Sequence, residues 1–296
     1  MRKRAVIVLV GLMSLMLSGC KSPKFVMTPA RTVEEDQRFL YYFYPAQQLF
    51  EEGEYQKSFE LMQFCYKLNP NDAMVNQYLG DFFIGMHKED VALAFYERSQ
   101  ANDPKNEKIW QRLRDCYMHQ RLPDKALWAQ DELDKQNGYD YMSAITRYYI
   151  YSMKNDADRA MQSIDDYLAI DPENVQFLRL KVQLYEFMPK AKIKDKIAAY
   201  RQLIAADPYN TMVLNNYAYL LATHKGDLKE AEALSRRTLQ SEPNNPVYLD
   251  TYAWILYLQG EQTLAKLYIQ QAVNKLGGQK EPEVEQHYET IINKKK

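Results

Sequence analysis

The chain has 296 residues, a formal net charge of −1 and an isoelectric point near 6.5. A nucleic-acid-binding protein normally carries a basic stripe and a high isoelectric point, so this composition argues against nucleic acid as a partner. Apolar residues make up 46% of the chain, which is enough for a continuous core and excludes a disordered protein.

The N-terminus has the pattern of a secretory signal. Three basic residues at positions 2–4 precede an apolar run over residues 5–17, and small residues follow that run. The run is shorter than the roughly 20 residues that a membrane-spanning helix needs. We therefore expect a signal peptide over residues 1–19.

The segment Leu17-Ser18-Gly19-Cys20 resembles the bacterial lipobox. That resemblance implies that Cys20 becomes the lipid-carrying first residue of the mature protein; cleavage without a lipid is the alternative. Two or three acyl chains hold a protein firmly, since each buried methylene contributes about 0.8 kcal/mol. Lys21 stands where an aspartate favours inner-membrane retention in enterobacterial lipoproteins, so the resemblance implies the outer membrane, facing the periplasm.

A tether is expected between the lipid and the folded part, over residues 20–38. Thr32 and Glu35 have the spacing of a capping box, which places the start of the first helix nearby.

Six chain-bending residues recur at nearly equal intervals along the rest of the chain. The intervals are 34, 34, 34, 36 and 35 residues. A fixed period in this range is typical of a solenoid, in which one supersecondary unit is copied and stacked. The six residues are Pro70, Pro104, Gly138, Pro172, Pro208 and Pro243.

The apolar positions of the repeat predict two helices per unit. Positions 4, 7, 8 and 11 share one face of a first helix, and positions 20, 24 and 27 share one face of a second. Small residues at positions 8 and 20, such as Gly80 and Ala92, let the two axes approach closely. Gly53 and Gly260 at position 15 are expected to end a first helix in the left-handed conformation. Position 1 falls at Phe39, Ala73, Glu107, Tyr141, Val175, Thr211 and Pro246.

This pattern resembles the tetratricopeptide repeat (TPR) family. The resemblance implies an all-α fold, a right-handed α-solenoid of about seven TPR units over residues 39–278. Residues 279–296 would then hold a capping helix, from Pro282 to Asn293, and a basic tail. Three departures are expected to kink or loosen the array: Pro45 interrupts the first helix, Arg114 and Tyr148 occupy the small position 8, and the fifth unit is lengthened.

In TPR arrays, positions 2, 5, 9 and 12 of the first helices line the concave face and bind partners. Carried over by this resemblance, those positions predict a groove with aromatic residues at both ends and carboxylates between them. Tyrosine and tryptophan are typical of binding hot spots. The alternative is that the rings pack against neighbouring helices. The predicted partner-binding residues are Phe43, Asp81, Asp115, Tyr149, Asn215, Tyr219, Asp250, Trp254 and Tyr257.

Patterns for catalysis and for metal or cofactor binding are weak. The four histidines are scattered, with no second histidine at i+3 or i+4, so each is expected at the surface or in a turn and no metal site is predicted. No nucleophile stands beside an oriented base, so we expect no enzyme and no cofactor. Cys65 and Cys116 are expected to be two buried thiols, a disulfide being the alternative.

The sequence therefore predicts a lipid-anchored TPR scaffold of a bacterial envelope that binds protein partners on its concave face. The alternative is an outer-membrane lipoprotein that captures glycan or peptide ligands through the same aromatic residues.

Overall fold

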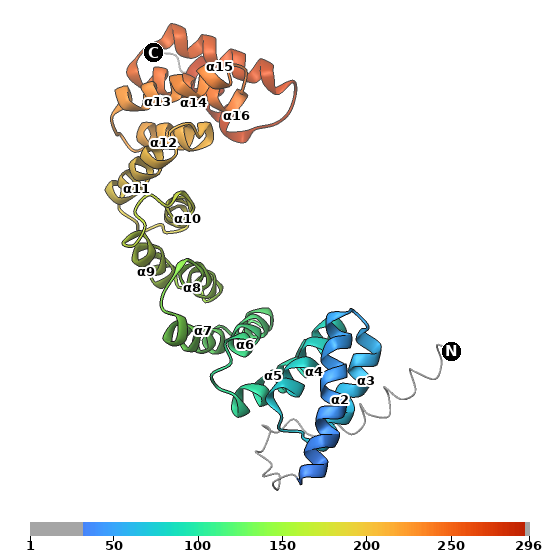
Figure 1. Ribbon diagram of the computed structural model, residues 1–296. Helices are drawn as coiled ribbons and strands as arrows, with labels where there is room; N and C mark the ends of the chain where they lie inside the picture. The colour runs from blue at the N-terminus through green and yellow to red at the C-terminus, as the bar shows by residue number, and fades with distance from the viewer. Residues whose placement is uncertain (1–31, 294–296) are drawn as a thin grey trace. The chain divides into compact units, whose positions relative to one another are not determined.

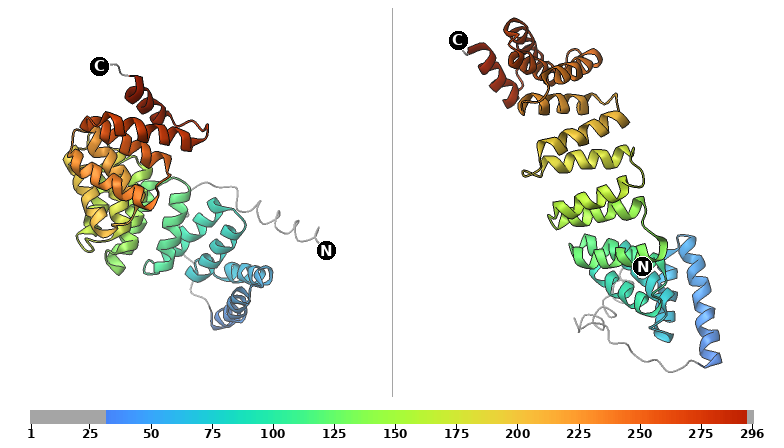
Figure 2. Two further views of the ribbon diagram at one scale, coloured as in Figure 1. Left: turned by 90° about the horizontal axis from the view of Figure 1, so that it is seen from above. Right: turned by 90° about the vertical axis from the view of Figure 1, so that its left-hand side faces the viewer.

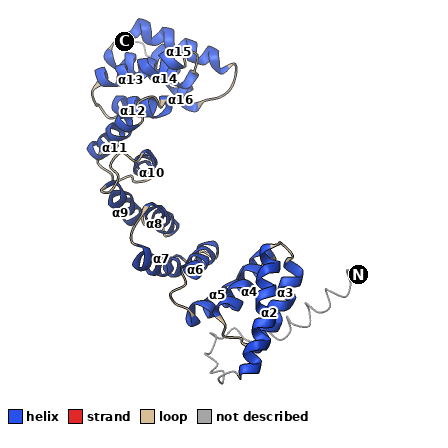
Figure 3. Cartoon of the chain, in the orientation of Figure 1, coloured by secondary structure: helices blue, strands red, loops and turns tan. Residues whose placement is uncertain are grey.

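The computed structural model of the protein describes residues 32–293, which form helices and connecting loops with no strand in that range (Figure 3). The predicted signal peptide, Cys20 and most of the tether lie outside these residues. No helix within the described range is long and apolar enough to cross a bilayer.

Between residues 32 and 293, the helices follow one another as seven antiparallel hairpins with one further helix after them; Figure 1 labels these helices. The first helices of the hairpins are α2 (Val33–Glu51), α4 (Ala73–Gly85), α6 (Glu107–His119), α8 (Tyr141–Met153), α10 (Val175–Glu186), α12 (Thr211–Thr223) and α14 (Pro246–Gln259).

The second helices pack against the first, as the right-hand view of Figure 2 shows for the middle hairpins. They are α3 (Tyr55–Leu68), α5 (Glu89–Asn102), α7 (Pro123–Asn137), α9 (Ala157–Leu168), α11 (Ile193–Ala206), α13 (Leu228–Ser241) and α15 (Gln262–Leu276). The last helix, α16, spans Pro282–Asn293, as predicted for the capping helix.

The contacts divide the chain into two compact units. The N-terminal unit ends at Tyr139 and holds α2–α7, and the C-terminal unit begins at Asp140 and holds α8–α16. Each unit contains hairpins with the same local construction.

An asparagine or aspartate directly precedes the first helix of each hairpin from α4 to α14. Its side-chain oxygen accepts a hydrogen bond from a backbone N–H of the first turn in every case but Asn106. Such a cap satisfies a donor that has no partner within the helix, so it defines where the helix begins. The residues are Asp72, Asn106, Asp140, Asn174, Asn210 and Asn245.

Small residues lie where the two helices of a hairpin cross. Ala46 and Ser58, at positions 8 and 20 of the first unit, are fully buried, and the Ser58 hydroxyl donates to the Ala46 carbonyl at 2.6 Å. This direct bond between the two helices requires their axes to be close, which confirms the role predicted for these positions.

The first expected departure from the repeat is not observed. Helix α2 runs without interruption through Pro45, so the prediction of a break was wrong. A proline removes one intrahelical hydrogen bond, that to the carbonyl four residues earlier. Here that carbonyl belongs to Tyr41, whose side chain is 74% exposed, so water can reach this side of the helix.

The other departures are accommodated locally. The Arg114 side chain is only 16% exposed and donates to Asp115 and to Gln130 of α7, at 2.9 and 3.2 Å, so hydrogen bonds accommodate it while α6 and α7 stay packed. The lengthened fifth unit is a loop between α10 and α11.

Candidate partner-binding surfaces

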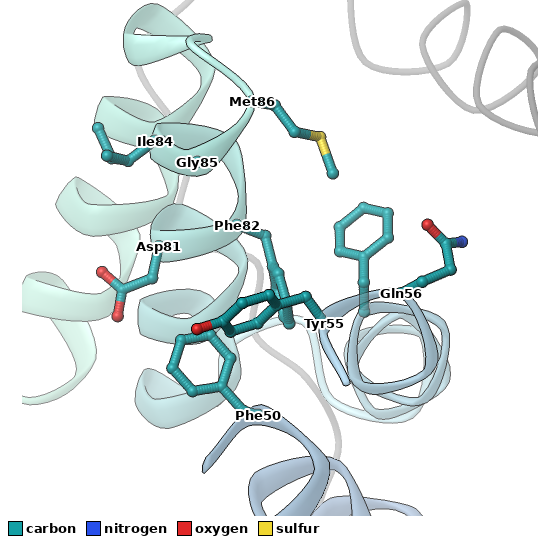
Figure 4. A pocket seen from close by; sticks show the side chains of 9 residues that line it. Phe50, Tyr55, Gln56, Asp81, Phe82, Ile84, Gly85 and Met86 are labelled. Atoms are coloured by element: carbon teal, nitrogen blue, oxygen red, sulfur yellow. The ribbon is translucent and has the colours of Figure 1, made fainter. Parts of the chain in front are cut away.

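A hollow lined by aromatic side chains lies between the C-terminal end of α2, the N-terminal end of α3 and the C-terminal end of α4. Its volume is about 450 Å³. The centroid of the Phe50 ring lies 5.4 Å from that of Tyr55 and 5.3 Å from that of Phe82. The centroids of the Phe59 and Phe82 rings are 5.1 Å apart. Figure 4 shows Phe50, Tyr55 and Phe82 gathered on one side of α4, with Met86 above them. We call this the aromatic hollow.

A second hollow of about 390 Å³ adjoins the first and extends to α6. The two share Phe50, Asp81 and Ile84. Figure 4 shows Asp81 and Ile84 pointing away from the ring cluster. The second hollow therefore begins at these residues and reaches Asp115 on α6. Asp81 and Asp115, which were predicted as partner-binding residues, thus lie in one continuous surface of the N-terminal unit.

The carboxylates of this surface are already paired with groups of the same unit. Asp81 accepts a hydrogen bond from the Tyr96 hydroxyl at 2.6 Å and lies 2.9 Å from Nε of Arg112, with only 13% of its side chain exposed. Asp115 pairs with Arg114 at 2.8 Å. The carboxylates expected between the aromatic residues are therefore each balanced by an arginine, Asp81 by Arg112 and Asp115 by Arg114.

Burial determines the acid–base behaviour of the groups behind this surface. It raises the pKa of Tyr96, and the hydrogen bond to Asp81 raises it further. It also raises the pKa of Cys116 to about 11, so the thiol stays protonated at neutral pH. Among residues 32–293, no three histidine, cysteine or acidic side chains gather in a way that could hold a metal ion.

Two other predicted residues lie apart from the hollows. Phe43 on α2 is half-buried and stacks on Phe39 at 5.3 Å, so packing against its own helix accounts for it. Tyr149 on α8 is 48% exposed and contacts the Tyr148 ring at 5.2 Å.

In the C-terminal unit, the helix α16 covers much of the predicted groove. Asp250 is only 3% exposed and bonds to His287 of α16 at 2.9 Å. Trp254 stacks on the same imidazole at 4.2 Å, and Tyr257 stacks on Trp254 at 5.4 Å. The prediction of an open groove at Asp250 is corrected, since this carboxylate is buried under the chain's own last helix.

His287 is the residue that the sequence analysis missed. It was expected at the surface or in a turn, but it is 4% exposed and paired with a carboxylate. The signal that could have found this pair is the sequence separation of 37 residues between Asp250 and His287, which is close to one repeat. Residues one repeat apart lie on the first helices of consecutive units, where their side chains can meet.

Comparisons with known proteins agree with a repeat protein of this kind. No protein-family model matches the chain. It is 31% identical over 132 residues to the BBSome complex member BBS4 of Xenopus tropicalis, and 30% identical over 139 residues to that of Bos taurus. These matches cover 43% and 45% of this chain but 24% and 26% of the relatives, so the chain spans about a quarter of their length.

Two solved structures resemble most of the chain. One is Naa15/Naa10 bound to HypK-THB, with a TM-score of 0.59, 12% identity and coverage of 87% of this chain and 40% of that one. The other is a tetratricopeptide repeat protein from Parabacteroides merdae, with a TM-score of 0.48, 16% identity and coverage of 87% and 100%.

Hairpins of about 34 residues, capped alike and crossing at small residues, define an α-solenoid protein. The chain has the TPR fold, as its sequence pattern predicted.

Proposed function

We propose that this chain is a non-catalytic scaffold that binds protein partners through its first helices and is held in a bacterial envelope by a lipid on Cys20. Its work would be to position partners at the membrane. The following observations support this proposal.

The observation that carries it is the pair of adjoining hollows in the N-terminal unit. They present aromatic rings and Ile84, which is 38% exposed, while the neighbouring carboxylates are balanced by arginines. Open apolar hollows of this kind suit an anchoring side chain of a peptide or protein, since buried apolar anchors supply most of the affinity at interfaces. The expected ligand is therefore a protein segment that inserts an apolar side chain beside Ile84.

The relatives point in the same direction. BBS4 is described as a member of a complex, and the Naa15/Naa10 structure contains a bound further protein. A role in holding other proteins is the property that this chain would share with them.

The anchor and location rest on the first residues of the sequence. A basic start, a short apolar run and Cys20 favour export and lipidation, and Lys21 after the cysteine favours the outer membrane, facing the periplasm. The check is the mass of the N-terminal peptide from the native host: the expected result is an acylated Cys20, with release from the membrane fraction in Cys20→Ala. An unmodified cysteine in a soluble mature protein would contradict the anchor.

The binding role is tested by Ile84→Glu, with Leu122→Glu as matched control. Both residues are in the N-terminal unit and about equally exposed, 38% and 39%, but Leu122 lies outside both hollows. Mild crosslinking of envelope membranes should give protein adducts that Ile84→Glu loses and Leu122→Glu keeps. Adducts unaffected by Ile84→Glu would place binding elsewhere, and capture of glycan alone would favour the ligand-capturing alternative.

A further inference from the structure

Helix α16 buries one narrow face against the C-terminal unit. The buried residues are Val284, His287 and Ile291, which the helical period places on the same side. Val284 and Ile291 join the apolar cluster of α14 and α15, which includes Leu249 and Ala253. The rest of α16 is mostly exposed, so one amphipathic helix lies on a surface built by the preceding hairpins.

The centre of this contact is polar and specific. Nδ1 of His287 lies 3.0 and 2.9 Å from the two carboxylate oxygens of Asp250, and the imidazole stacks on Trp254 at 4.2 Å with an angle of 15° between the rings. A buried carboxylate that loses its partner is strongly destabilising. The surface therefore requires a helix that brings an N–H donor to Asp250.

A second polar contact lies one turn earlier along α16. The Glu283 carboxylate of α16 lies near the Tyr219 hydroxyl of α12, and burial together with this neighbouring carboxylate raises the pKa of Tyr219. The Tyr219 ring also lies 6.0 Å from the His287 ring. Both α12 and α14 thus contribute recognition groups to the same helix.

Two buried polar atoms of α12 and α14 lack a hydrogen-bond partner within the described residues. They are Nε1 of Trp254 and Oδ1 of Asn215. Asn215 occupies on α12 the repeat position that Asp250 occupies on α14. Buried polar groups are nearly always hydrogen-bonded in folded proteins, so a ligand that supplied these bonds would make contacts that α16 does not.

The connection to α16 allows it to leave. Gly277 and Gly278 have φ angles of 58° and 94°, and residues 277–283 are all exposed. A helix of 12 residues is marginal without tertiary contacts. Since α16 packs mainly on α14 and α15, its release would leave the preceding hairpins in place.

We propose that the surface formed by α14 and α15, with Tyr219 of α12 at its edge, is a binding site for an amphipathic helix of a partner protein, and that α16 occupies it until that helix displaces it. The inference rests on the scaffold function proposed above. The partner helix carries the chemistry that α16 shows: an acidic residue for Tyr219, an N–H donor ring four residues later for Asp250, and apolar residues flanking that ring on the same face.

The test uses the full chain and a fluorescent peptide of residues 279–293 as the probe. Val284→Asp/Ile291→Asp releases α16, and Glu285→Gln/Glu289→Gln, on its exposed face, is the matched control. The release variant should bind the peptide at least 10-fold more tightly than the parent and control, by fluorescence anisotropy. A His287→Ala peptide should bind at least 10-fold more weakly than the unchanged peptide.

A folded release variant that binds the peptide no better than the parent overturns the proposal. Should the release variant not fold, hydrogen exchange on the unmodified chain decides: α16 should exchange at least 100-fold faster than α14, and exchange in step with α14 overturns the proposal. A dimer formed by swapping α16 would assign the surface to self-association and also overturn it. The Ile84→Glu experiment concerns another surface, so each proposal can fail alone.

Discussion

Gly80 lies directly against the ring of Tyr96. A Cβ at Gly80 would stand 2.3 Å from Cε1 of Tyr96, and that ring is held by its hydroxyl's bond to Asp81 at 2.6 Å. A larger residue at this position would push the Tyr96 ring away, so glycine allows the observed packing of α4 on α5, and this packing supports the Asp81 end of both hollows.

Gly80→Ala is accordingly expected to lower the free energy of unfolding by about 1–3 kcal/mol, the range for an overpacked core. Gly85→Ala is the control in the same helix, because no atom lies within 4 Å of a Cβ built there. It should leave stability unchanged or raise it by up to about 1 kcal/mol. Urea denaturation measures both, and equal effects of the two substitutions would refute this account of Gly80.

Position 15 of the repeat adopts the left-handed conformation even where the residue is not glycine. His87, Arg121, Asn155 and Lys225 have φ angles of 55–56°, which cost an L residue about 1–2 kcal/mol. Lys225→Gly should therefore raise the free energy of unfolding by about 0.5–1 kcal/mol, after the larger backbone entropy of glycine is deducted.

The matched control for Lys225→Gly is Lys266→Gly, another exposed lysine of the same unit but inside α15. It should lower stability by up to about 1 kcal/mol, since glycine is a poor helix former. Thermal unfolding of the two variants should move in opposite directions; a shift of the same sign would contradict the conformational argument.

These four residues also show which features of the structure could be predicted from the sequence and which could not. The hairpins were predictable because the apolar positions recur from repeat to repeat, so an exception at a single position does not hide the pattern. The left-handed turns at His87 and Lys225 were not, because only glycine signals that conformation by its identity. The pairing of Asp250 with His287 could not be predicted for a similar reason. It depends on two single residues that face each other across helices, and such a pair does not recur from one repeat to the next.

The two thiols in the hairpins should be unreactive in the folded protein. Cys65 and Cys116 are buried and free, as the sequence analysis predicted, and burial raises the pKa of Cys65 to about 12 and that of Cys116 to about 11. Since the thiolate is the reactive form, alkylation by iodoacetamide at pH 8 should be at least about 100-fold slower than in urea. Peptide mapping of each cysteine separately provides the measurement, and rapid labelling of either one in the native state would contradict the prediction.

Substitutions at the two residues of the Asp250–His287 pair are expected to have different effects on the free energy of unfolding. His287→Ala leaves the Asp250 carboxylate buried without a donor, which costs about 3–5 kcal/mol in such sites. Here the cost has an upper limit, the docking free energy of α16, because release of the helix rehydrates the carboxylate. Asp250→Asn removes the buried charge and keeps an acceptor for Nδ1, so we expect stability within about 1 kcal/mol of the parent, or higher.

The pH dependence of His287→Ala has a definite sign. In the parent, burial raises the pKa of Asp250 above its ordinary value, while the bond and charge of His287 lower it and Glu283 raises it slightly. Without His287 the folded pKa rises further. A carboxyl whose pKa is higher in the folded state destabilises the fold most above that pKa, and this cost disappears below the unfolded value of about 3.9. The deficit of His287→Ala in urea denaturation should therefore be largest at pH 7.5 and shrink toward pH 4.5, whereas Asp250→Asn should show no such trend; a deficit that grew on acidification would mean that the carboxylate is not the group left without a partner.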